Sequence, residues 1–259
     1  MEMNSEEASE YLIRIGYTDA VRSDLSSLHQ LQRRHLMTVP FENLDIHYGQ
    51  KIELDTSKFY QKIVRSKRGG FCYELNELFG QLLLYLGYQV KRISARVYDD
   101  RSGYGEEYDH LTLIIHLEGI EYLVDVGFGE FASTPIEIKI ESVHSDPRGQ
   151  FSLDHYDQNY IRICKLERGN KIPQYIFKPR HRDLFEFKLK CLYHQTSEQS
   201  HFTQKKMISL MTHEGRITLT DQKLKILKNS KKNEVLIRSE SEFFEYLRHY
   251  FSIELMESN

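Results

Sequence analysis

The residue with the clearest chemical potential is Cys72, in the stretch Lys67-Arg-Gly-Gly-Phe-Cys-Tyr-Glu-Leu-Asn76. Two glycines precede it, and apolar residues then recur at the spacing of one helix face as far as Gly87. This pattern predicts a helix that begins at Cys72. The unpaired N–H groups and the dipole of a helix N-terminus stabilise an anion, so a thiolate there is a candidate nucleophile. The alternative is an inert buried cysteine.

A cysteine nucleophile needs a base, and the sequence offers one on a predicted hairpin. His110 begins an alternating strand over 110–117, and Glu118-Gly119 fits a two-residue turn. That turn pairs Thr112 with Asp125 and places His110 diagonal to Asp125 on the same face, roughly 7–8 Å away at the backbone. The sequence therefore predicts a coupled His110–Asp125 pair. In the competing interpretation Asp125 caps a turn and His110 is a surface residue.

Three motifs carry a resemblance to a known family. Residues 68–76 resemble the RGGxCxELN signature of the arylamine N-acetyltransferases, and residues 40–44 and 125–129 resemble that family's PFENL and DVGFG motifs. The motifs occur in the family's order and spacing. The resemblance is clear through residue 135, patchy from 136 to 177 and recognisable again from 178 to 220. Three motifs in order are far more specific than any one of them.

The resemblance implies a catalytic triad, because the family's cysteine, histidine and aspartate fall on Cys72, His110 and Asp125. It also implies that Arg68 and Glu74, which flank the nucleophile, form an ion pair that fixes the loop. Ordinary solvated charges are the alternative for these two residues.

The resemblance further implies where acetyl-coenzyme A meets the protein, as a co-substrate and not as a permanently bound cofactor. The loop Gly127, Phe128 and Gly129 is the expected approach for the thioester end. The expected contacts in the later cleft segment are the hydroxyls of Thr196, Ser197 and Ser200. Surface loop residues are the alternative for these hydroxyls. Cys191 and Glu198 depart from the family pattern, which usually has asparagine and proline there.

The elements that must position these groups change character along the chain. Residues 1–86 predict helices, with Asp24 as a helix cap. Alternating patterns then predict strands at 89–98, 110–117, 121–126, 136–140, 160–165 and 175–177, with 142–150 as a loop. Further strands are predicted within 205–237, with a turn at 213–215 and a solvated loop at 228–233. Residues 242–251 predict the last helix.

Together with the resemblance, these elements predict an α+β fold with a papain-like Cys-His-Asp arrangement. A helical N-terminal domain (1–86) would hold the cysteine, a β-barrel-like domain (87–190) the histidine and aspartate, and a C-terminal α/β lid (191–259) would cover them.

Composition narrows the classes of function. The 259 residues carry a net charge of −3 with both signs well mixed, which argues against a nucleic-acid partner. No apolar run reaches the length of a membrane span, and the acidic start shows no signal peptide, so a cytoplasmic protein without a membrane partner is predicted. Three scattered cysteines do not make a disulfide framework. The absence of CxxC and HExxH patterns predicts no metal site.

The implied activity is a ping-pong acetyl transfer from acetyl-coenzyme A through Cys72 to an arylamine, a hydrazine or an N-hydroxyarylamine. Three alternatives remain open. One is a macrolactam-forming amide synthase of the same family, and another is a cysteine hydrolase or transglutaminase-like enzyme with the same triad. The third is a non-catalytic binding protein that keeps the fold.

Overall fold

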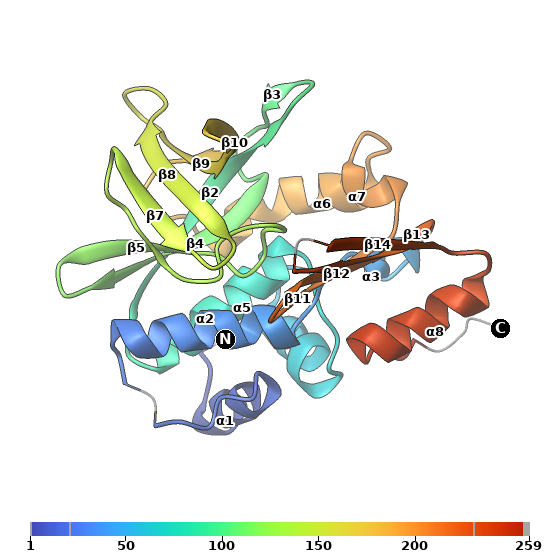
Figure 1. Ribbon diagram of the computed structural model, residues 1–259. Coiled ribbons are helices and arrows are strands. Elements are labelled where there is room, and N and C mark those ends of the chain that lie inside the picture. The colour runs from blue at the N-terminus through green and yellow to red at the C-terminus, as the bar shows by residue number, and fades with distance from the viewer. Residues whose placement is uncertain (1, 21, 230, 256–259) are drawn as a thin grey trace.

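The computed structural model describes residues 2–20, 22–229 and 231–255. Its N-terminal part is a layer of helices (Figure 1). Asn4 and Asp24 cap the first two helices, the latter by accepting a hydrogen bond from the N–H of Ser27 at 2.8 Å. The elements of this layer are α1 (Ser5–Arg14), α2 (Leu25–Thr38), α3 (Leu44–His47), α4 (Thr56–Tyr60), a π-helical turn (Gln61–Arg65) and α5 (Cys72–Tyr85).

The middle of the chain forms an antiparallel sheet that curls into a nearly closed barrel (Figure 1). Its strand order is β6-β5-β4-β2-β10-β9-β8-β7, and β3 pairs with β2. The strands are β2 (Gln89–Asp99), β3 (Gly103–Tyr104), β4 (His110–Leu117), β5 (Ile120–Val124), β6 (Ile136–Glu137), β7 (Ser142–Asp146), β8 (Gly149–His155), β9 (Ile161–Glu167) and β10 (Asn170–Phe177). The predicted hairpin register is confirmed, because Leu113 lies opposite Val124 and Leu117 opposite Ile120.

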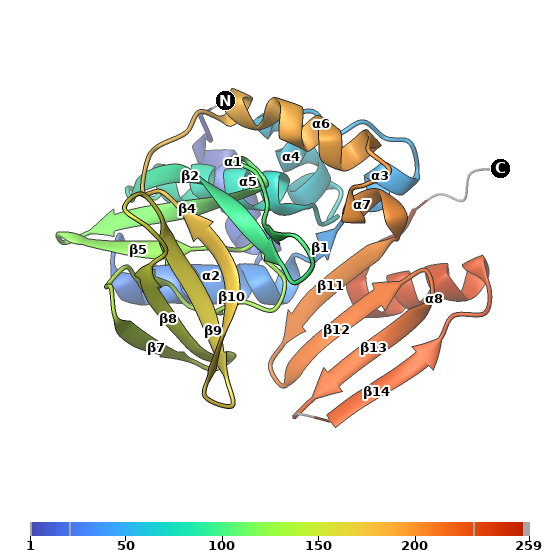
Figure 2. The same cartoon turned by 90° about the horizontal axis from the view of Figure 1, so that it is seen from above.

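The C-terminal part adds a second sheet in the order β1-β11-β12-β13-β14, which lies beside the barrel in Figure 2. Strand β1 (Phe41–Glu42) comes from the helical layer, so the two ends of the chain share this sheet. The remaining elements are a 3₁₀ turn (Leu184–Phe187), α6 (Lys188–Thr196), α7 (His201–Gln204), β11 (Met207–Thr212), β12 (Gly215–Thr220), β13 (Lys223–Lys228), β14 (Lys231–Leu236) and α8 (Glu240–Phe251).

The buried apolar residues form three clusters. One fills the barrel and one lies between the C-terminal sheet and α8. The largest joins the helices to β4 and β5, so the core crosses the predicted boundary at residue 86. That packing fixes the cysteine helix against the strands that carry His110.

Two loop predictions are wrong. Residues 142–150 form most of the β7–β8 hairpin, and residues 231–233 belong to β14. Both segments are rich in polar residues, and strand β7 is half-buried at best, so no apolar alternation marks it. Ser230, which the loop prediction also includes, lies outside the described residues. None of the described helices has both the length and the apolar character that crossing a membrane requires.

Candidate active site

Cys72 is the first residue of α5, as predicted, and its side chain is buried. The helix begins here because the Glu74 carboxylate turns back and accepts a hydrogen bond from the N–H of Phe71 at 3.0 Å. Beyond it, the apolar face of α5 is fully buried. The first N–H groups of a helix have no acceptor within it, so at this position they are available to a negatively charged group.

His110 and Asp125 are brought together as the hairpin register predicts. Nε2 of His110 lies 2.6 Å from Oδ2 of Asp125, and both side chains are almost fully buried. The Cys72 side chain is close enough to the imidazole to raise its pKa further. Burial by itself would lower the pKa of His110, but the Asp125 carboxylate outweighs it and raises that pKa to about 10. The histidine is therefore a cation at neutral pH, next to the thiol.

The Asp125 carboxylate has further donors, of which the Asn76 and Tyr175 side chains were missed by sequence reasoning. Oδ1 accepts from Nδ2 of Asn76 and from the N–H of Gly127, each at 2.9 Å, and Oδ2 accepts from the Tyr175 hydroxyl at 3.2 Å. Burial would raise the pKa of Asp125, but the charge of His110 and the hydrogen bonds from His110, Asn76 and Gly127 hold it below its usual range. Asn76 follows Cys72 by one helical turn, and that spacing was the available signal.

Two amide side chains tie the helices to the strands of the site. Asn76 also accepts from the N–H of Val126 at 2.9 Å and donates to the carbonyl of Leu111 at 2.7 Å. Gln32 of α2 donates to the carbonyls of Asp125 and Ala132, at 3.5 and 3.4 Å. Because Asn76 and Cys72 share a helix, the same element sets the position of both the thiol and the aspartate.

The loop after Asp125 passes directly over the cysteine. A Cβ atom on Gly127 would lie 2.7 Å from Cα of Cys72, so a side chain there would displace the backbone. Phe128 packs edge-on against the rings of His110 and Tyr175, with ring centroids 5.1 Å apart in both pairs. Gly129 is open, and a Cβ atom on it would meet nothing within 4 Å. The loop thus closes one side of the thiol and leaves space at Gly129.

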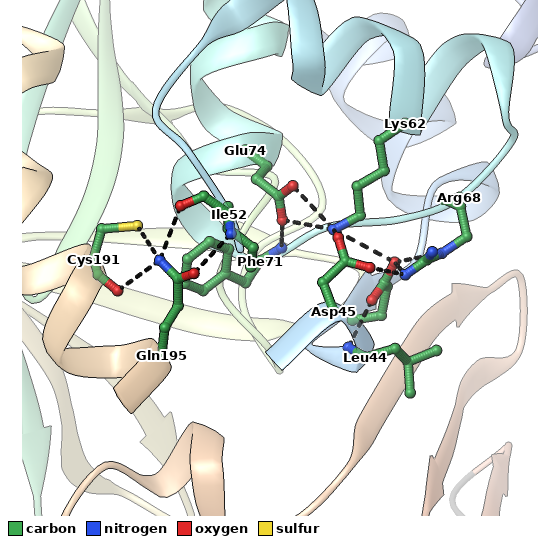
Figure 3. A network of polar contacts seen from close by, with 10 residues as sticks. Leu44, Asp45, Ile52, Lys62, Arg68, Phe71, Glu74, Cys191 and Gln195 are labelled. Carbon is green, nitrogen blue, oxygen red and sulfur yellow. Dashed lines mark hydrogen bonds and ion pairs between the residues drawn. The ribbon is translucent and has the colours of Figure 1, made fainter. Parts of the chain in front are cut away.

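A buried ion network includes Arg68 and Glu74, which flank Cys72 in the sequence (Figure 3). Arg68 lies 2.7 Å from Glu42 and 2.8 Å from Asp45, whereas Lys62 lies 2.7 Å from Asp45 and 3.0 Å from Glu74. The predicted direct Arg68–Glu74 pair is therefore wrong. Each of the two residues has its own partner, and Glu42 and Asp45 connect them. The network joins residues of the 40–44 and 68–76 motifs.

Glu74 carries an unusual charge state in this network. Burial raises the pKa of Glu74 to about 7, against the opposing charge of Lys62. The surrounding carboxylates in turn hold the pKa of Lys62 above its usual value, despite burial. Lys62 therefore stays protonated at neutral pH, whereas Glu74 is protonated more readily than an ordinary carboxyl group.

In the segment predicted to contact coenzyme A, the hydroxyl groups form hydrogen bonds within the segment itself. Thr196 donates to the carbonyl of Leu192 at 2.9 Å, and Ser197 accepts from the N–H of Gln199 at 3.2 Å. Ser200 caps α7 by accepting from the N–H of Phe202. Their contacts to a ligand stay a prediction, as do those of residues 127–129. Among the described residues, no group of three His, Cys, Asp or Glu side chains is placed to hold a metal ion.

A helix that begins at a cysteine, packed against a barrel that supplies a buried His–carboxylate pair, is the arrangement of the papain-like class of proteins. A family model described as N-acetyltransferase matches residues 24–259. The chain is 34% identical to the arylamine N-acetyltransferase pineal gland isozyme NAT-3 of Gallus gallus, over 95% of this chain and 93% of the relative. It is 29% identical to the arylamine N-acetyltransferase of Mycolicibacterium smegmatis, over 95% and 91%.

Solved structures agree with these sequence matches. The arylamine N-acetyltransferase of Mycobacterium marinum in complex with CoA superposes with a TM-score of 0.88 at 26% identity, over 95% of this chain and 92% of that chain. The chain belongs to the arylamine N-acetyltransferase family, and it is an acyltransferase.

Proposed function

We propose that this enzyme transfers an acetyl group from acetyl-coenzyme A to an arylamine, a hydrazine or an N-hydroxyarylamine, by way of acetyl-Cys72. Family membership supports the donor and the acceptor class, and the relative solved with CoA supports the co-substrate. The observation that carries the mechanism is the buried Asp125–His110 pair, which lies close to Cys72 at the start of α5.

In the first half-reaction the Cys72 thiolate attacks the thioester carbonyl carbon. The bond from that carbon to the sulfur of coenzyme A breaks, and the leaving thiolate takes the proton of the His110 imidazolium. The backbone N–H of Cys72 is a natural donor to the carbonyl oxygen as its negative charge develops. Coenzyme A departs, and an acetyl-cysteine with a neutral His110 remains.

In the second half-reaction the amine nitrogen attacks the acetyl-cysteine carbonyl. His110 accepts the amine proton, and the Cys72 thiolate leaves, which restores the starting ion pair. Asp125 keeps the Nε2 proton directed toward itself, so the other ring nitrogen, Nδ1, serves the reacting atoms.

The covalent intermediate gives the direct test. Mixing the enzyme with acetyl-coenzyme A and no acceptor is expected to add one acetyl mass to the peptide that contains Cys72. Adding an arylamine or a hydrazine is expected to discharge it and to yield the acetylated acceptor. Mass spectrometry of the intact chain and of its peptides follows both steps.

Two variants control the experiment. Cys72→Ser is expected to load no acetyl group, because an unactivated hydroxyl is a much weaker nucleophile than a thiolate, and His110→Ala is expected to load slowly. Equal labelling of Cys164 or Cys191 would indicate nonspecific chemistry. Rapid acetylation of the amine by Cys72→Ser would refute the mechanism.

A further inference from the structure

A buried histidine that the proposed mechanism does not use links the α6–α7 segment (residues 188–204) to strand β4. His194 of α6 is 7% exposed, and its Nδ1 lies 3.2 Å from Oγ of Ser200, just before α7. Its Nε2 lies 3.2 Å from Oδ1 of Asp109, in ion-pair range but without the alignment of a hydrogen bond. Asp109 directly precedes His110. One imidazole thus reaches from the segment predicted to contact coenzyme A to the residue beside His110.

Ser200 gives this imidazole a hydrogen-bond partner in either protonation state. When His194 is neutral with its proton on Nε2, Nδ1 accepts from the Ser200 hydroxyl. When His194 is protonated, Nδ1–H donates to Oγ, and the hydroxyl turns to the carbonyl of His194, which lies 3.3 Å away. In both states Oγ accepts from the N–H of Phe202 at 3.2 Å. His194 can therefore gain or lose a proton without leaving Nδ1 or the hydroxyl unpaired.

The charge that faces His194 comes from the loop before β4. Asp109 is the acidic side chain in ion-pair range of His194 among the described residues, and it also lies 3.6 Å from Nζ of Lys190 on α6. Lys190 in turn lies 3.1 Å from the exposed Glu106. The other groups packed on the imidazole are the uncharged rings of Tyr73 on α5, Tyr193 on α6 and Phe202 on α7.

The Asp109–His194 contact changes its strength with pH, because one partner changes its charge and the other does not. Burial would raise the pKa of Asp109, but the contact with His194 and the charges of His194, Lys190 and His110 hold it below its usual range. Histidine is the side chain that ordinarily gains or loses its charge between about pH 5 and 8. The contact is an ion pair at the acidic end of that range and a weaker contact with a neutral ring at the alkaline end.

The other contacts that hold the segment lack this dependence. Asn43 donates to the backbone carbonyls of residues 202 and 205, and Gln195 exchanges two hydrogen bonds with the backbone of Ile52, all between uncharged groups. His201 lies 3.7 Å from Asp99, but its side chain is 75% exposed, and such surface pairs contribute little.

Asp109 is the fixed side of the contact. The hydroxyl of Tyr73, which follows Cys72 on α5, donates to the carbonyls of Tyr108 and Asp109 at 2.7 and 3.3 Å. The backbone before His110 is therefore tied to the cysteine helix without the help of His194. Loss of the ion pair consequently loosens the α6–α7 segment and leaves β4 in place.

We propose that Asp109 and His194 are positioning residues that form a pH-dependent clamp on the coenzyme A site. With His194 protonated, the ion pair holds the α6–α7 segment against β4, together with the predicted ligand contacts Thr196 and Ser197. With His194 neutral, the segment is held less firmly and coenzyme A binds more weakly. The inference rests on the proposed function, because it concerns the affinity for the acyl donor.

Calorimetry with coenzyme A measures the clamp without turnover. The dissociation constants of His194→Gln and the wild type are compared as a ratio at about pH 5.5 and about pH 8, so that titration of the ligand itself cancels. The wild type is expected to bind about fivefold more tightly at the lower pH and equally at the higher one. Asp109→Asn is expected to lose the same pH-dependent advantage, and the double variant to lose no more of it than either single change.

The matched control is His201→Gln, which removes an exposed histidine from the same segment and is expected to keep the wild-type pH dependence. A second measurement needs no variant. Coenzyme A is expected to move the midpoint of the NMR titration of the His194 ring to higher pH, because a ligand that prefers the protonated form also favours protonation.

Two results overturn this inference alone, given a wild type that binds coenzyme A. One is a ratio of dissociation constants that stays constant between the two pH values, and the other is a His194 titration that the ligand leaves unmoved. A wild type that binds no coenzyme A at either pH contradicts the proposed function, and this inference falls with it.

Discussion

At the scale of single residues, the Asp125 carboxylate is the centre of the site, because four separate parts of the fold donate hydrogen bonds to it. His110 comes from β4, Asn76 from α5, Tyr175 from β10, and the N–H of Gly127 from the loop itself. A carboxylate with so many donors stays ionised, and an ionised acceptor requires a proton on the ring nitrogen that faces it. The tautomer of His110 is thus set by the surrounding fold.

Asp125→Asn tests this role. The fold is expected to survive, because the amide nearly preserves the shape of the carboxylate. Turnover is expected to fall by about four orders of magnitude, since an amide neither enforces the tautomer nor stabilises the imidazolium. Steady-state kinetics and a circular dichroism melt separate the two effects.

Asp154→Asn is the control for Asp125→Asn, because Asp154 pairs with Arg162 and Lys171 away from the site. It is expected to leave turnover unchanged. Near-normal turnover of Asp125→Asn would mean that Asp125 is only a turn cap.

Some of the contacts of Asp125 can be predicted from the sequence and others cannot, for a physical reason. Strand alternation and a two-residue turn place His110 and Asp125 on one face, since both lie in a single hairpin. Tyr175 and Gln32 reach Asp125 from distant parts of the chain. Nothing local in their own segments indicates that contact, because it depends on how the barrel closes and how α2 packs.

At the scale of elements, the cysteine loop is held between β1 and the ion network. The N–H of Glu42 donates to the carbonyl of Gly70 at 2.8 Å, and the N–H of Gly70 donates back to the carbonyl of Pro40. A Cβ atom on Gly69 would lie 2.1 Å from that same proline oxygen. The two glycines before Cys72 therefore serve close backbone contact as well as helix initiation.

The network makes a pH-dependent contribution to stability. The pKa of Glu74 is about 7, compared with an ordinary value of 4.5 in the unfolded chain. Between these values the native state holds a proton that the unfolded state has lost, so this group's contribution to the free energy of unfolding falls as pH rises. The stability of the wild type relative to Glu74→Gln is expected to decrease from pH 4.5 to about 7 and to level off above.

Urea unfolding of both proteins at several pH values measures that difference. Glu53→Gln is the control, because Lys58 holds the pKa of the exposed Glu53 below its usual value. The contribution of Glu53 is expected to rise with pH only up to about 4.5, its ordinary pKa, and to stay level between pH 4.5 and 7. A wild-type advantage over Glu74→Gln that increases between pH 4.5 and 7 would contradict a protonated native Glu74.

The bounds of helices and strands were predicted correctly where burial of one face gives the apolar residues a regular spacing. The α5 helix and strand β4 are buried along most of their length, and their bounds agree with the apolar pattern. In β7 the apolar Val143 points outward and is 56% exposed. A strand at the end of a sheet can be held by backbone hydrogen bonds alone, so its sequence need not alternate.

At the scale of the whole molecule, Asn43 joins the helical layer to the C-terminal sheet. Its Oδ1 accepts from the N–H of Met207 at 2.7 Å, and its Nδ2 donates to the carbonyls of Phe202 and Lys205, each at 2.9 Å. The side chain is 1% exposed. One amide thus satisfies three backbone groups in the turn between α7 and β11.

Asn43→Ala is expected to lower the free energy of unfolding by about 2 kcal/mol or more, because it leaves buried backbone groups without partners. Limited proteolysis is expected to show faster cleavage between α7 and β11. Asn4→Ala is the control, since it removes only an exposed helix cap, costs about 1 kcal/mol and should not expose that turn. Unchanged cleavage and stability in Asn43→Ala would show that the turn does not depend on this amide.

Strand β1 also has a consequence for the order of folding. Phe41 pairs with Ser209 on one side and forms a parallel bridge with Gly70 on the other. The Phe41–Ser209 contact joins residues far apart in the chain. Such contacts form slowly, because a long loop must close before the contact contributes to stability. Synthesis runs from the N-terminus, so the helical layer with β1 leaves the ribosome before β11, the strand partner of β1, has been made. We therefore expect β1, which bridges Gly70 in the cysteine loop, to gain its second partner only after residues 207–212 have emerged.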